Sequence, residues 1–177
     1  MAEETYHHCS SVPEAHRRTA TSELRCAVIT VSDTRTFQTD RGGQLAGELL
    51  QKAGHQLVDR AIVRDDVEQI RGKVNALLQG GSAQVIILTG GTGLSARDQT
   101  VEALRPLMTR EIPGFGELFR MLSFQEIGAA AMLSRAFAGV MGKVVVFALP
   151  GSPAAVRLAL EKLILPELGH LLAEIGK

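Results

Sequence analysis

Three patterns in the sequence predict a three-layer α/β domain with a mostly parallel sheet and one antiparallel strand. Short apolar runs alternate with amphipathic segments three times in the first half of the chain. That alternation is typical of a parallel sheet with helices on both faces. A glycine-rich turn follows the third apolar run. Two further apolar runs flank Met141-Gly142 and predict a hairpin, which supplies the antiparallel strand.

The first half of the chain divides into elements by its apolar periodicity. Runs rich in β-branched and aliphatic residues predict strands at 25–31, 56–63 and 84–88. Apolar residues at helical spacing predict helices at 43–53, 67–79 and 100–108. Asp65-Asp66 and Asp98 are the expected N-caps of the second and third helices. The right-handed crossover rule then determines most of the topology.

The second half is less regular. We expect helices near 116–123 and 124–132, strands at 133–140 and 143–149, and two short helices around Pro166. Residues 24–177 then form a single domain. The polar, aperiodic residues 1–23 are expected to be a flexible N-terminal arm. Its His7, His8, Cys9 and His16 match no standard zinc spacing, so an inert or subunit-contacting arm is favoured over a metal site.

Composition excludes several classes of protein. The 177 residues are 45% hydrophobic and 21% charged, which excludes a disordered chain. A net charge of zero and 4% aromatic residues argue against a nucleic-acid partner. No apolar run reaches the roughly 20 residues of a membrane helix, and no signal-peptide pattern opens the chain. Two cysteines in different surroundings do not suggest a disulfide, so a cytoplasmic protein without membrane contact is expected.

The turn Thr89-Gly-Gly-Thr-Gly93 is the strongest functional signal, because it joins a buried strand to a helix. Glycines let backbone N–H groups gather around a phosphate, although a plain tight turn is the alternative. The turn is no Walker A motif. Gly91-x-Gly93-x-x-Ala96 formally matches the dinucleotide fingerprint, which leaves a nucleotide-binding oxidoreductase as an alternative. Glu111 has the spacing of the required acid, but a full βαβ unit hardly fits before it.

Acidic residues follow each of the three predicted parallel strands. Asp33 follows the first strand, Asp65-Asp66 the second, and Asp98 lies in the loop after the third. These loops meet at one edge of a parallel sheet, where carboxylates beside phosphates favour a bound Mg²⁺. The alternative is helix capping. Leu149-Pro-Gly-Ser-Pro153 could form a second wall of the pocket there, or only end the last strand.

Six motifs in order, spread over residues 24–172, resemble the MoaB/Mog family of molybdenum-cofactor biosynthesis proteins. They are Val31-Ser-Asp33-Thr, Thr89-Gly-Gly-Thr-Gly93, Arg97-Asp98-x-Thr100, Pro113-Gly-Phe-Gly-Glu117, Leu133-Ser-Arg135 and Leu149-Pro-Gly-Ser-Pro153. The stretch from Met121 to Gly128 is closer to the MoaB branch than to the Mog branch. Two departures stand out. Gly42 occupies the place of the family's usual serine, and Arg64 that of a common proline.

The resemblance implies a molybdopterin adenylyltransferase, a nucleotidyltransferase that moves AMP from MgATP to the terminal phosphate of molybdopterin and releases pyrophosphate. A non-catalytic molybdopterin carrier or assembly protein is the alternative. The resemblance also implies a trimer or hexamer, with Ala129–Leu133 and the C-terminal Leu/Ile stripe as candidate contacts or ordinary core. By motif, the catalytic and metal-binding residues are Asp65 and Asp98. The implied ligand-binding residues are Ser32, Asp33, Gly90, Gly91, Thr92, Gly93, Ser134, Arg135, Gly151 and Ser152.

Overall fold

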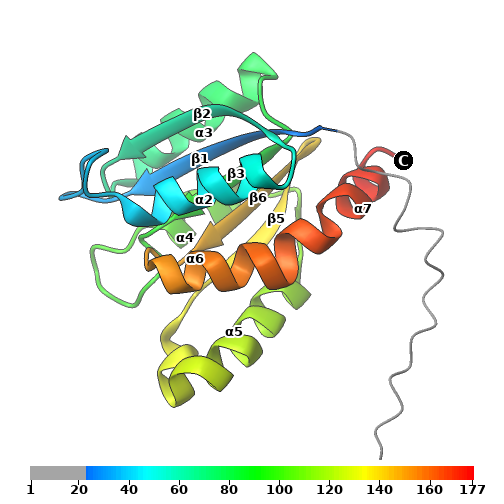
Figure 1. The fold of residues 1–177 in the computed structure, drawn as a ribbon. Helices are drawn as coiled ribbons and strands as arrows, with labels where there is room; N and C mark the ends of the chain where they lie inside the picture. The colour runs from blue at the N-terminus through cyan, green and yellow to red at the C-terminus, as the bar shows by residue number, and fades with distance from the viewer. Residues whose placement is uncertain (1–22) are drawn as a thin grey trace, which may run out of the picture.

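The computed structural model describes residues 23–177, so the predicted arm and its His7, His8, Cys9 and His16 lie outside the described residues. These residues form a six-stranded sheet in the order β2-β1-β3-β6-β5-β4, with helices on both faces (Figure 1). Strands β2, β1, β3 and β6 pair in parallel, and β5 is antiparallel to β6 and to β4. The predicted three-layer α/β class, with one strand running against the rest, is therefore confirmed.

The elements follow one another as the periodicity predicts in the first half of the chain. Both β1 and β2 have the expected bounds, and every predicted helix in this half is present. The strands are β1 Arg25–Val31, β2 Gln56–Val63, β3 Val85–Thr89, β4 Arg110–Glu111, β5 Phe137–Met141 and β6 Val144–Leu149. The helices are α2 Arg41–Lys52, α3 Val67–Gly80, α4 Thr100–Leu104, α5 Pro113–Ile127, α6 Pro153–Ala159 and α7 Leu165–Ile175.

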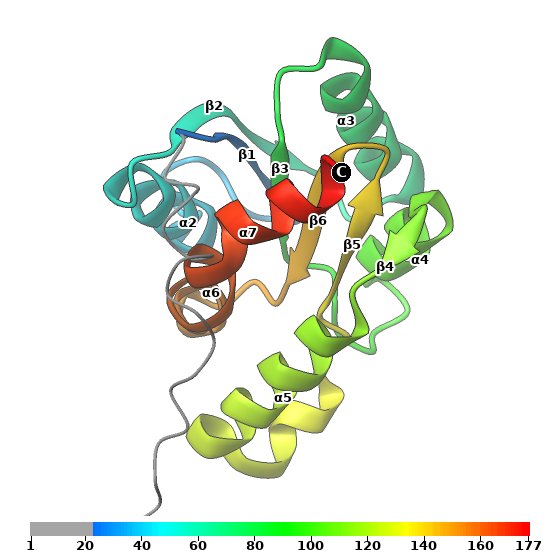
Figure 2. The same cartoon turned by 90° about the vertical axis from the view of Figure 1, so that its right-hand side faces the viewer.

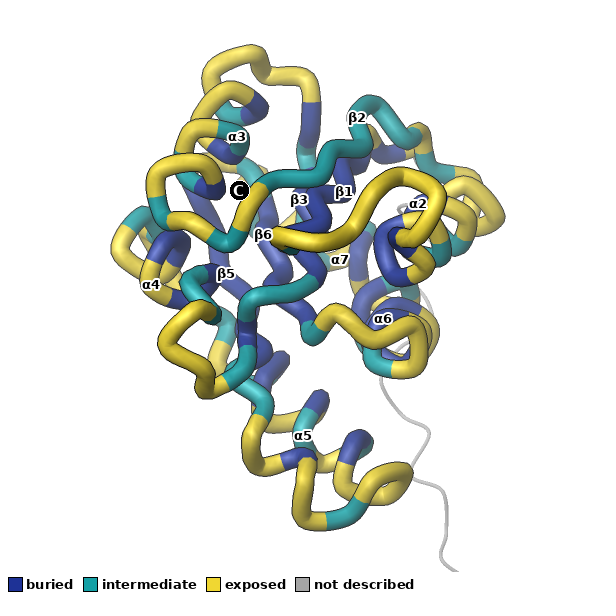
Figure 3. Tube along the Cα trace, turned by 90° about the vertical axis from the view of Figure 1, so that its left-hand side faces the viewer, coloured by how far each residue is buried: buried dark blue, intermediate teal, exposed yellow. Residues whose placement is uncertain are grey.

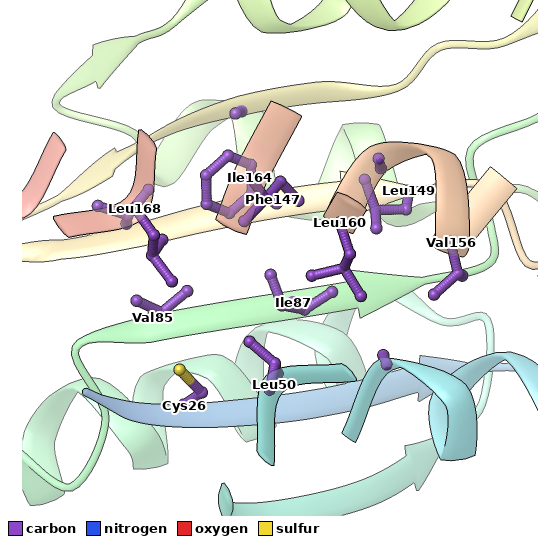
Figure 4. Close-up of a cluster of buried hydrophobic side chains, with 14 of the residues drawn as sticks. Cys26, Leu50, Val85, Ile87, Phe147, Leu149, Val156, Leu160, Ile164 and Leu168 are labelled. Atoms are coloured by element: carbon purple, nitrogen blue, oxygen red, sulfur yellow. The ribbon is translucent and has the colours of Figure 1, made fainter. Parts of the chain in front are cut away.

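Alternate side chains of the central strands enter two separate cores. On one face Cys26, Val28, Val85 and Ile87 pack against α2, α5, α6 and α7 (Figure 4). On the other face Ala27, Ile29 and other strand residues pack against α3 and α4. Strands covered on both faces carry near-continuous apolar runs, which is why their sequence gave no polar alternation. The buried residues follow the sheet, and the exposed ones lie on the loops and on the outer sides of the helices (Figure 3).

The second half departs from the predicted bounds. Strand β5 begins at Phe137 rather than at 133, because a short 3-10 helix occupies Gly128–Leu133. Helix α4 likewise ends early and continues as a 3-10 turn over Arg105–Leu107. The two-residue strand β4, which was not predicted, completes the edge of the sheet. Helix α5 extends away from this edge (Figure 2). These elements are too short for periodicity to identify them.

The C-terminal helices are continuous rather than separate. Helix α6 passes into α7 through one π-helical segment, Leu160–Ile164, which ends two residues before Pro166. Proline has no N–H for the helical ladder, and a local widening of the helix accommodates that loss. Within residues 23–177, no helix combines the length and the apolar character needed to cross a membrane.

Candidate functional site

The carboxyl ends of the parallel strands gather the loops that carry the predicted site (left in Figure 1). The first residue after β3 is joined to the end of β6, since the Gly90 N–H donates to the Leu149 carbonyl at 2.9 Å. The Thr89 hydroxyl donates to the Pro150 carbonyl at 3.1 Å. This is the edge of an open α/β sheet where ligands bind.

A cavity of about 730 Å³ opens at this edge, between the loop after β1, the start of α2 and the turn after β6. Of the predicted ligand-binding residues, Ser32, Gly90, Gly151 and Ser152 line it. The Leu149–Pro153 turn is therefore a wall of the cavity as well as the end of a strand. Ser152 also caps α6, because its hydroxyl accepts a hydrogen bond from the Ala155 N–H at 3.2 Å.

The glycine turn after β3 is held in place by hydrogen bonds that Thr100 and Arg135 donate to its carbonyl groups. Thr100 donates to Gly90 O through Oγ1 at 2.8 Å and to Gly91 O through its N–H at 3.0 Å. Arg135 donates to Thr92 O through its N–H at 3.1 Å and to Gly93 O through Nε at 2.7 Å. Four consecutive carbonyls are thus bound to the protein. Because the C=O and N–H of one trans peptide unit point in opposite directions, the N–H that shares a peptide unit with each bound carbonyl points away from the group that binds that carbonyl.

Positive φ angles shape the same turn. Gly90 and Gly91 have φ angles of +105° and +63°, a region that other residues rarely adopt. A Cβ on Gly90 would clash with the Val31 carbonyl, and one on Gly91 with the Thr100 hydroxyl and the Asp65 carboxylate. Successive N–H groups in a turn of this kind form an anion-binding concavity. These φ angles explain why glycine stands at both positions. That the turn binds phosphate stays a prediction.

Two carboxylates lie beside the turn, and a third, that of Asp33, accepts a hydrogen bond from the Asp65 N–H at 3.4 Å. The Asp65 carboxylate accepts a hydrogen bond from the Gln99 N–H at 2.8 Å, and Asp33 is ion-paired with Arg97. A Cβ on Gly91 would lie 2.8 Å from both Asp65 oxygens, and one on Gly93 would lie 2.8 Å from Asp98 Oδ2. Asp65 and Asp98 therefore flank the glycine turn, as the sequence predicted.

Burial raises the pKa of Asp65 above its ordinary value. The Gln99 N–H lowers that pKa, the neighbouring Asp98 and Asp33 raise it, and Arg97 lowers it. Burial is the largest of these effects, so the cost of ionising Asp65 comes mainly from lost hydration. A cation placed between Asp65 and Asp98 would reverse that cost.

The capping interpretation fails for two of the acids. The residue that caps α3 is Asp66, whose Oδ1 accepts from the Gln69 N–H at 3.0 Å, and not Asp65. Helix α4 begins after Gln99, and Asp98 is not its cap. Asp98 accepts instead from the Ser95 N–H at 2.8 Å and closes a tight turn. Asp65 therefore does not cap α3.

The donor set around the turn fits a hard cation. Carboxylate oxygens and phosphates are the ligands that Mg²⁺ takes in nucleotide sites. Within residues 23–177, no group of three or more His, Cys, Asp or Glu side chains is arranged to hold a metal by itself. Two carboxylates would therefore need the phosphates of a ligand to complete the coordination.

Ser134 and Arg135 lie elsewhere than the large cavity. They line a smaller pocket of about 320 Å³ between α5 and the start of β5. The Arg135 guanidinium is engaged with protein groups, namely Gly93 O, Asp98 O at 3.0 Å and the Glu102 carboxylate. The pKa of Glu102 falls below its ordinary value, mainly through the hydrogen bond from Arg135. Whether these two residues contact a ligand stays a prediction.

Sequence reasoning missed the residue that shapes the cavity floor. Asp40 is buried and caps α2, with its Oδ1 accepting from the Gly43 N–H at 2.9 Å. Its Oδ2 accepts from the Thr30 hydroxyl at 2.8 Å and pairs with Arg60 at 2.9 Å. An Asp three residues before the predicted helix start was the available signal. Gly42 permits close packing here, since a Cβ would lie 2.9 Å from Gly151 O.

The dinucleotide interpretation finds no support in the geometry. Glu111, the acid at the fingerprint spacing, lies in β4 at the far edge of the sheet. Its carboxylate pairs with Arg105 at 3.0 Å. The fingerprint needs that acid at the end of the neighbouring parallel strand.

A family model described as "Probable molybdopterin binding domain" matches residues 27–170. The chain belongs to the MoaB/Mog family. Molybdenum cofactor biosynthesis protein B of Bacillus cereus is 52% identical over 163 residues, which are 92% of this chain and 96% of that protein. The family assignment made from six motifs is confirmed.

Solved structures of MoaB/Mog proteins share the fold. The tungsten cofactor synthesizing protein MoaB from Pyrococcus furiosus is 38% identical with a TM-score of 0.81, covering 89% of this chain and all of that one. The molybdopterin biosynthesis Mog protein from Mycobacterium ulcerans is 27% identical with a TM-score of 0.79, covering 86% and 99%. The higher identity to the MoaB protein agrees with the branch predicted from Met121–Gly128.

Proposed function

We propose that this chain binds molybdopterin and transfers AMP from MgATP to its terminal phosphate. The observation that carries the proposal is the glycine turn, whose four carbonyls are bound to Thr100 and Arg135 beside Asp65 and Asp98. A terminal phosphate oxygen of molybdopterin forms a bond to the α-phosphorus of ATP. The bond from that phosphorus to the bridging oxygen breaks, and pyrophosphate leaves.

The turn stabilises the charge that develops in this reaction. Two anions must meet, and negative charge grows on the non-bridging and leaving oxygens. Backbone donors that are already oriented stabilise such charge without reorganising, which is worth about 3–4 kcal/mol for a single donor in other enzymes. Thr100 and Arg135 supply that orientation here by holding the carbonyls.

Asp65 and Asp98 would hold Mg²⁺ against the phosphates, and a bound Mg²⁺ would neutralise charge on the transferring group. The nucleophile needs no activating base, because a phosphate monoester is already largely ionised at neutral pH. The adjacent cavity of about 730 Å³ has the volume for a nucleotide or pterin group. Its Ser32 and Ser152 hydroxyls supply polar contacts.

The experiment is to measure pyrophosphate release from purified protein given molybdopterin and MgATP. We expect one pyrophosphate for each adenylated molybdopterin, and no release without either substrate. Molybdopterin binding without pyrophosphate release would instead identify a non-catalytic carrier. A thermal shift with nicotinamide cofactors, absent with ATP, would favour the oxidoreductase.

The proposal includes assembly into trimers or hexamers of the same chain in the cytoplasm. An exposed apolar patch supports a second copy as partner, with Met132 76% exposed. It lies on α5 and the following 3-10 helix and comprises Leu118, Met121, Phe124, Ile127, Met132 and Leu133. Leu168 of the C-terminal stripe is buried, and its partly buried neighbours pack on the same cluster, so the stripe contributes to the core. Sedimentation of Phe124→Glu beside the unaltered chain tests the patch, and a stable monomer of the unaltered chain at micromolar concentration would contradict it.

A further inference from the structure

We propose that Arg135 is a positioning residue, which orders the phosphate loop through its carbonyl groups and does not itself contact the phosphate. The proposal rests on the proposed function and specifies how the glycine turn acquires its shape. Arg135 lies 42 residues from Gly93 and belongs to the segment between the 3-10 helix and β5.

Three of the five guanidinium N–H groups of Arg135 donate to protein acceptors, one from each nitrogen. Its Nε donates to Gly93 O at 2.7 Å, its Nη2 to Asp98 O at 3.0 Å, and its Nη1 to the Glu102 carboxylate. The backbone N–H of Arg135 adds a bond to Thr92 O at 3.1 Å. One residue thus fixes both ends of the loop that carries Asp98. Because each of the three guanidinium nitrogens already donates within the protein, the side chain is fixed in place by the loop and by Glu102.

The segment that presents Arg135 is itself fixed from α5. Arg120 Nη1 donates to Ala136 O at 3.2 Å and to Ser134 O at 3.4 Å, the carbonyls on either side of Arg135. Helix α5 approaches closely because a glycine faces that segment, where a Cβ on Gly116 would lie 2.8 Å from Ala136 O. Glu102 of α4 holds the guanidinium from the opposite side.

This arrangement has a chemical consequence for anion binding. If Arg135 acts through the loop, its hydrogen-bond fork matters and its charge alone does not. Lysine keeps the charge but cannot donate to three acceptors in a plane. Arg135→Lys should then weaken anion binding about as much as Arg135→Met. If Arg135 touched the phosphate directly, Lys would retain most of the affinity.

The test measures binding of inorganic tripolyphosphate by calorimetry and the backbone amide shifts of Gly91 and Gly93 by NMR. We expect Arg135→Met and Arg135→Lys each to weaken binding about tenfold, the factor that corresponds to 1.4 kcal/mol. Both amide shifts should move in the free variants. Glu102→Gln should have a smaller effect in the same direction.

Arg71→Met is the matched control. Arg71 also donates from its guanidinium to backbone carbonyls of α4, Ala103 O at 2.9 Å and Glu102 O at 3.1 Å, but it does not touch the loop. We expect the Arg71→Met variant to be destabilised about as much as the Arg135 variants, and to bind tripolyphosphate with the affinity of the unaltered chain.

Three results would overturn the assignment. Unaltered tripolyphosphate binding by folded Arg135→Met would show that Arg135 does not order the loop. Near-normal binding by Arg135→Lys alone would show that residue 135 contacts the anion directly. Equal weakening by Arg71→Met would make the effect a general loss of packing. If the unaltered chain bound neither tripolyphosphate nor ATP, the proposed function itself would fail, which is a distinct outcome. Should Arg135→Met not fold, the Lys and Glu102→Gln variants decide.

Discussion

Asp40 and Asp65 lie at the same edge of the sheet, yet they meet opposite surroundings. Asp40 is buried, and its carboxylate receives the Thr30 hydroxyl, the Gly43 N–H and the Arg60 guanidinium. Asp65 is half-buried, receives the Gln99 N–H, and lies near the like charges of Asp33 and Asp98. An acid whose charge is satisfied within the chain supports the fold. An acid whose charge is opposed by its neighbours is suited to hold a cation.

The largest expected effect comes from a substitution in the glycine turn beside Asp65. Gly91→Val would require a β-branched residue at a φ of +63°, with its Cβ against Thr100 and Asp65. We expect ATP affinity to fall by at least about a hundredfold, or 2.7 kcal/mol. Calorimetry with ATP checks it. Gly72→Val is the control, because a Cβ there meets nothing within 4 Å. Unchanged ATP affinity in folded Gly91→Val would refute the phosphate loop.

Asp98→Asn sharpens the comparison between a cation ligand and a cap. The amide oxygen can still accept the Ser95 N–H, so the loop should persist while the charge is lost. We expect molybdopterin to bind and adenylyl transfer to fall about a hundredfold to a thousandfold, measured as pyrophosphate release. Asp66→Asn should be nearly silent, since Asn caps α3 as well as Asp does. Near-normal turnover of Asp98→Asn would move the metal site away from Asp98.

Asp40→Ala tests the structural side. Removing one partner of a buried ion pair leaves Arg60 uncompensated, and the cap of α2 is lost as well. We expect a loss of unfolding free energy of about 3–5 kcal/mol, measured by urea denaturation. Asp59→Ala breaks the more exposed pair with Lys73 and should cost less than about 1 kcal/mol. Similar losses of unfolding free energy in Asp40→Ala and Asp59→Ala would show that the burial of the Asp40 pair adds nothing to its effect on stability.

The smallest expected effect concerns the pH dependence of stability at Asp65. Burial raises the pKa of Asp65 in the folded chain, so folding favours its protonated form. Stability from this group is present below the unfolded pKa, about 3.9, and is lost as pH rises through the raised folded pKa. Without metal, Asp65→Asn should gain a few tenths of a kcal/mol at pH 7, a value reduced by solvent screening.

Thermal unfolding at pH 7 and at pH 3 checks this prediction. The gain should vanish at pH 3, where Asp65 is protonated in both states. A variant that is less stable than the unaltered chain at pH 7 would show that Asp65 is stabilising when ionised.

Local patterns predicted the elements that are long and buried. Strand β1 is covered on both faces, and its continuous apolar run predicted its bounds. The bounds of β2 were also predicted, although it is a partly buried edge strand that contains Asp59 and Arg60. Strand β4 was not predicted, since two residues show no usable period. The helices expected near 116–123 and 124–132 form one helix, α5, followed by the 3-10 helix Gly128–Leu133. The glycine turn was found because Gly90 and Gly91 adopt φ angles that the sequence can signal only with glycine.

Side-chain partners were beyond the reach of sequence spacing. Asp98 reads locally as a cap of the following helix, yet it binds Ser95, and Asp65 takes the Gln99 N–H from 34 residues away. The resemblance implies a ligand-binding role for Arg135, and the structure adds that its guanidinium donates to Gly93 O, Asp98 O and the Glu102 carboxylate. Contacts of this kind depend on which loops the sheet brings together, and spacing along the chain does not predict them.

The sequence by itself determined the layered fold, the position of the glycine turn and the family. Hydrophobic periodicity and the positions of glycines are local properties, so they can be recognised without knowing which distant segments pack together. Only the tertiary structure decided which acid is paired within the chain and which lies near like charges. Asp40 and Asp65 are the same residue type, each beside the start of a helix, and the difference is Arg60 against Asp33 and Asp98. The charge of an acid depends on what surrounds it, and those surroundings come from strands far apart in the chain.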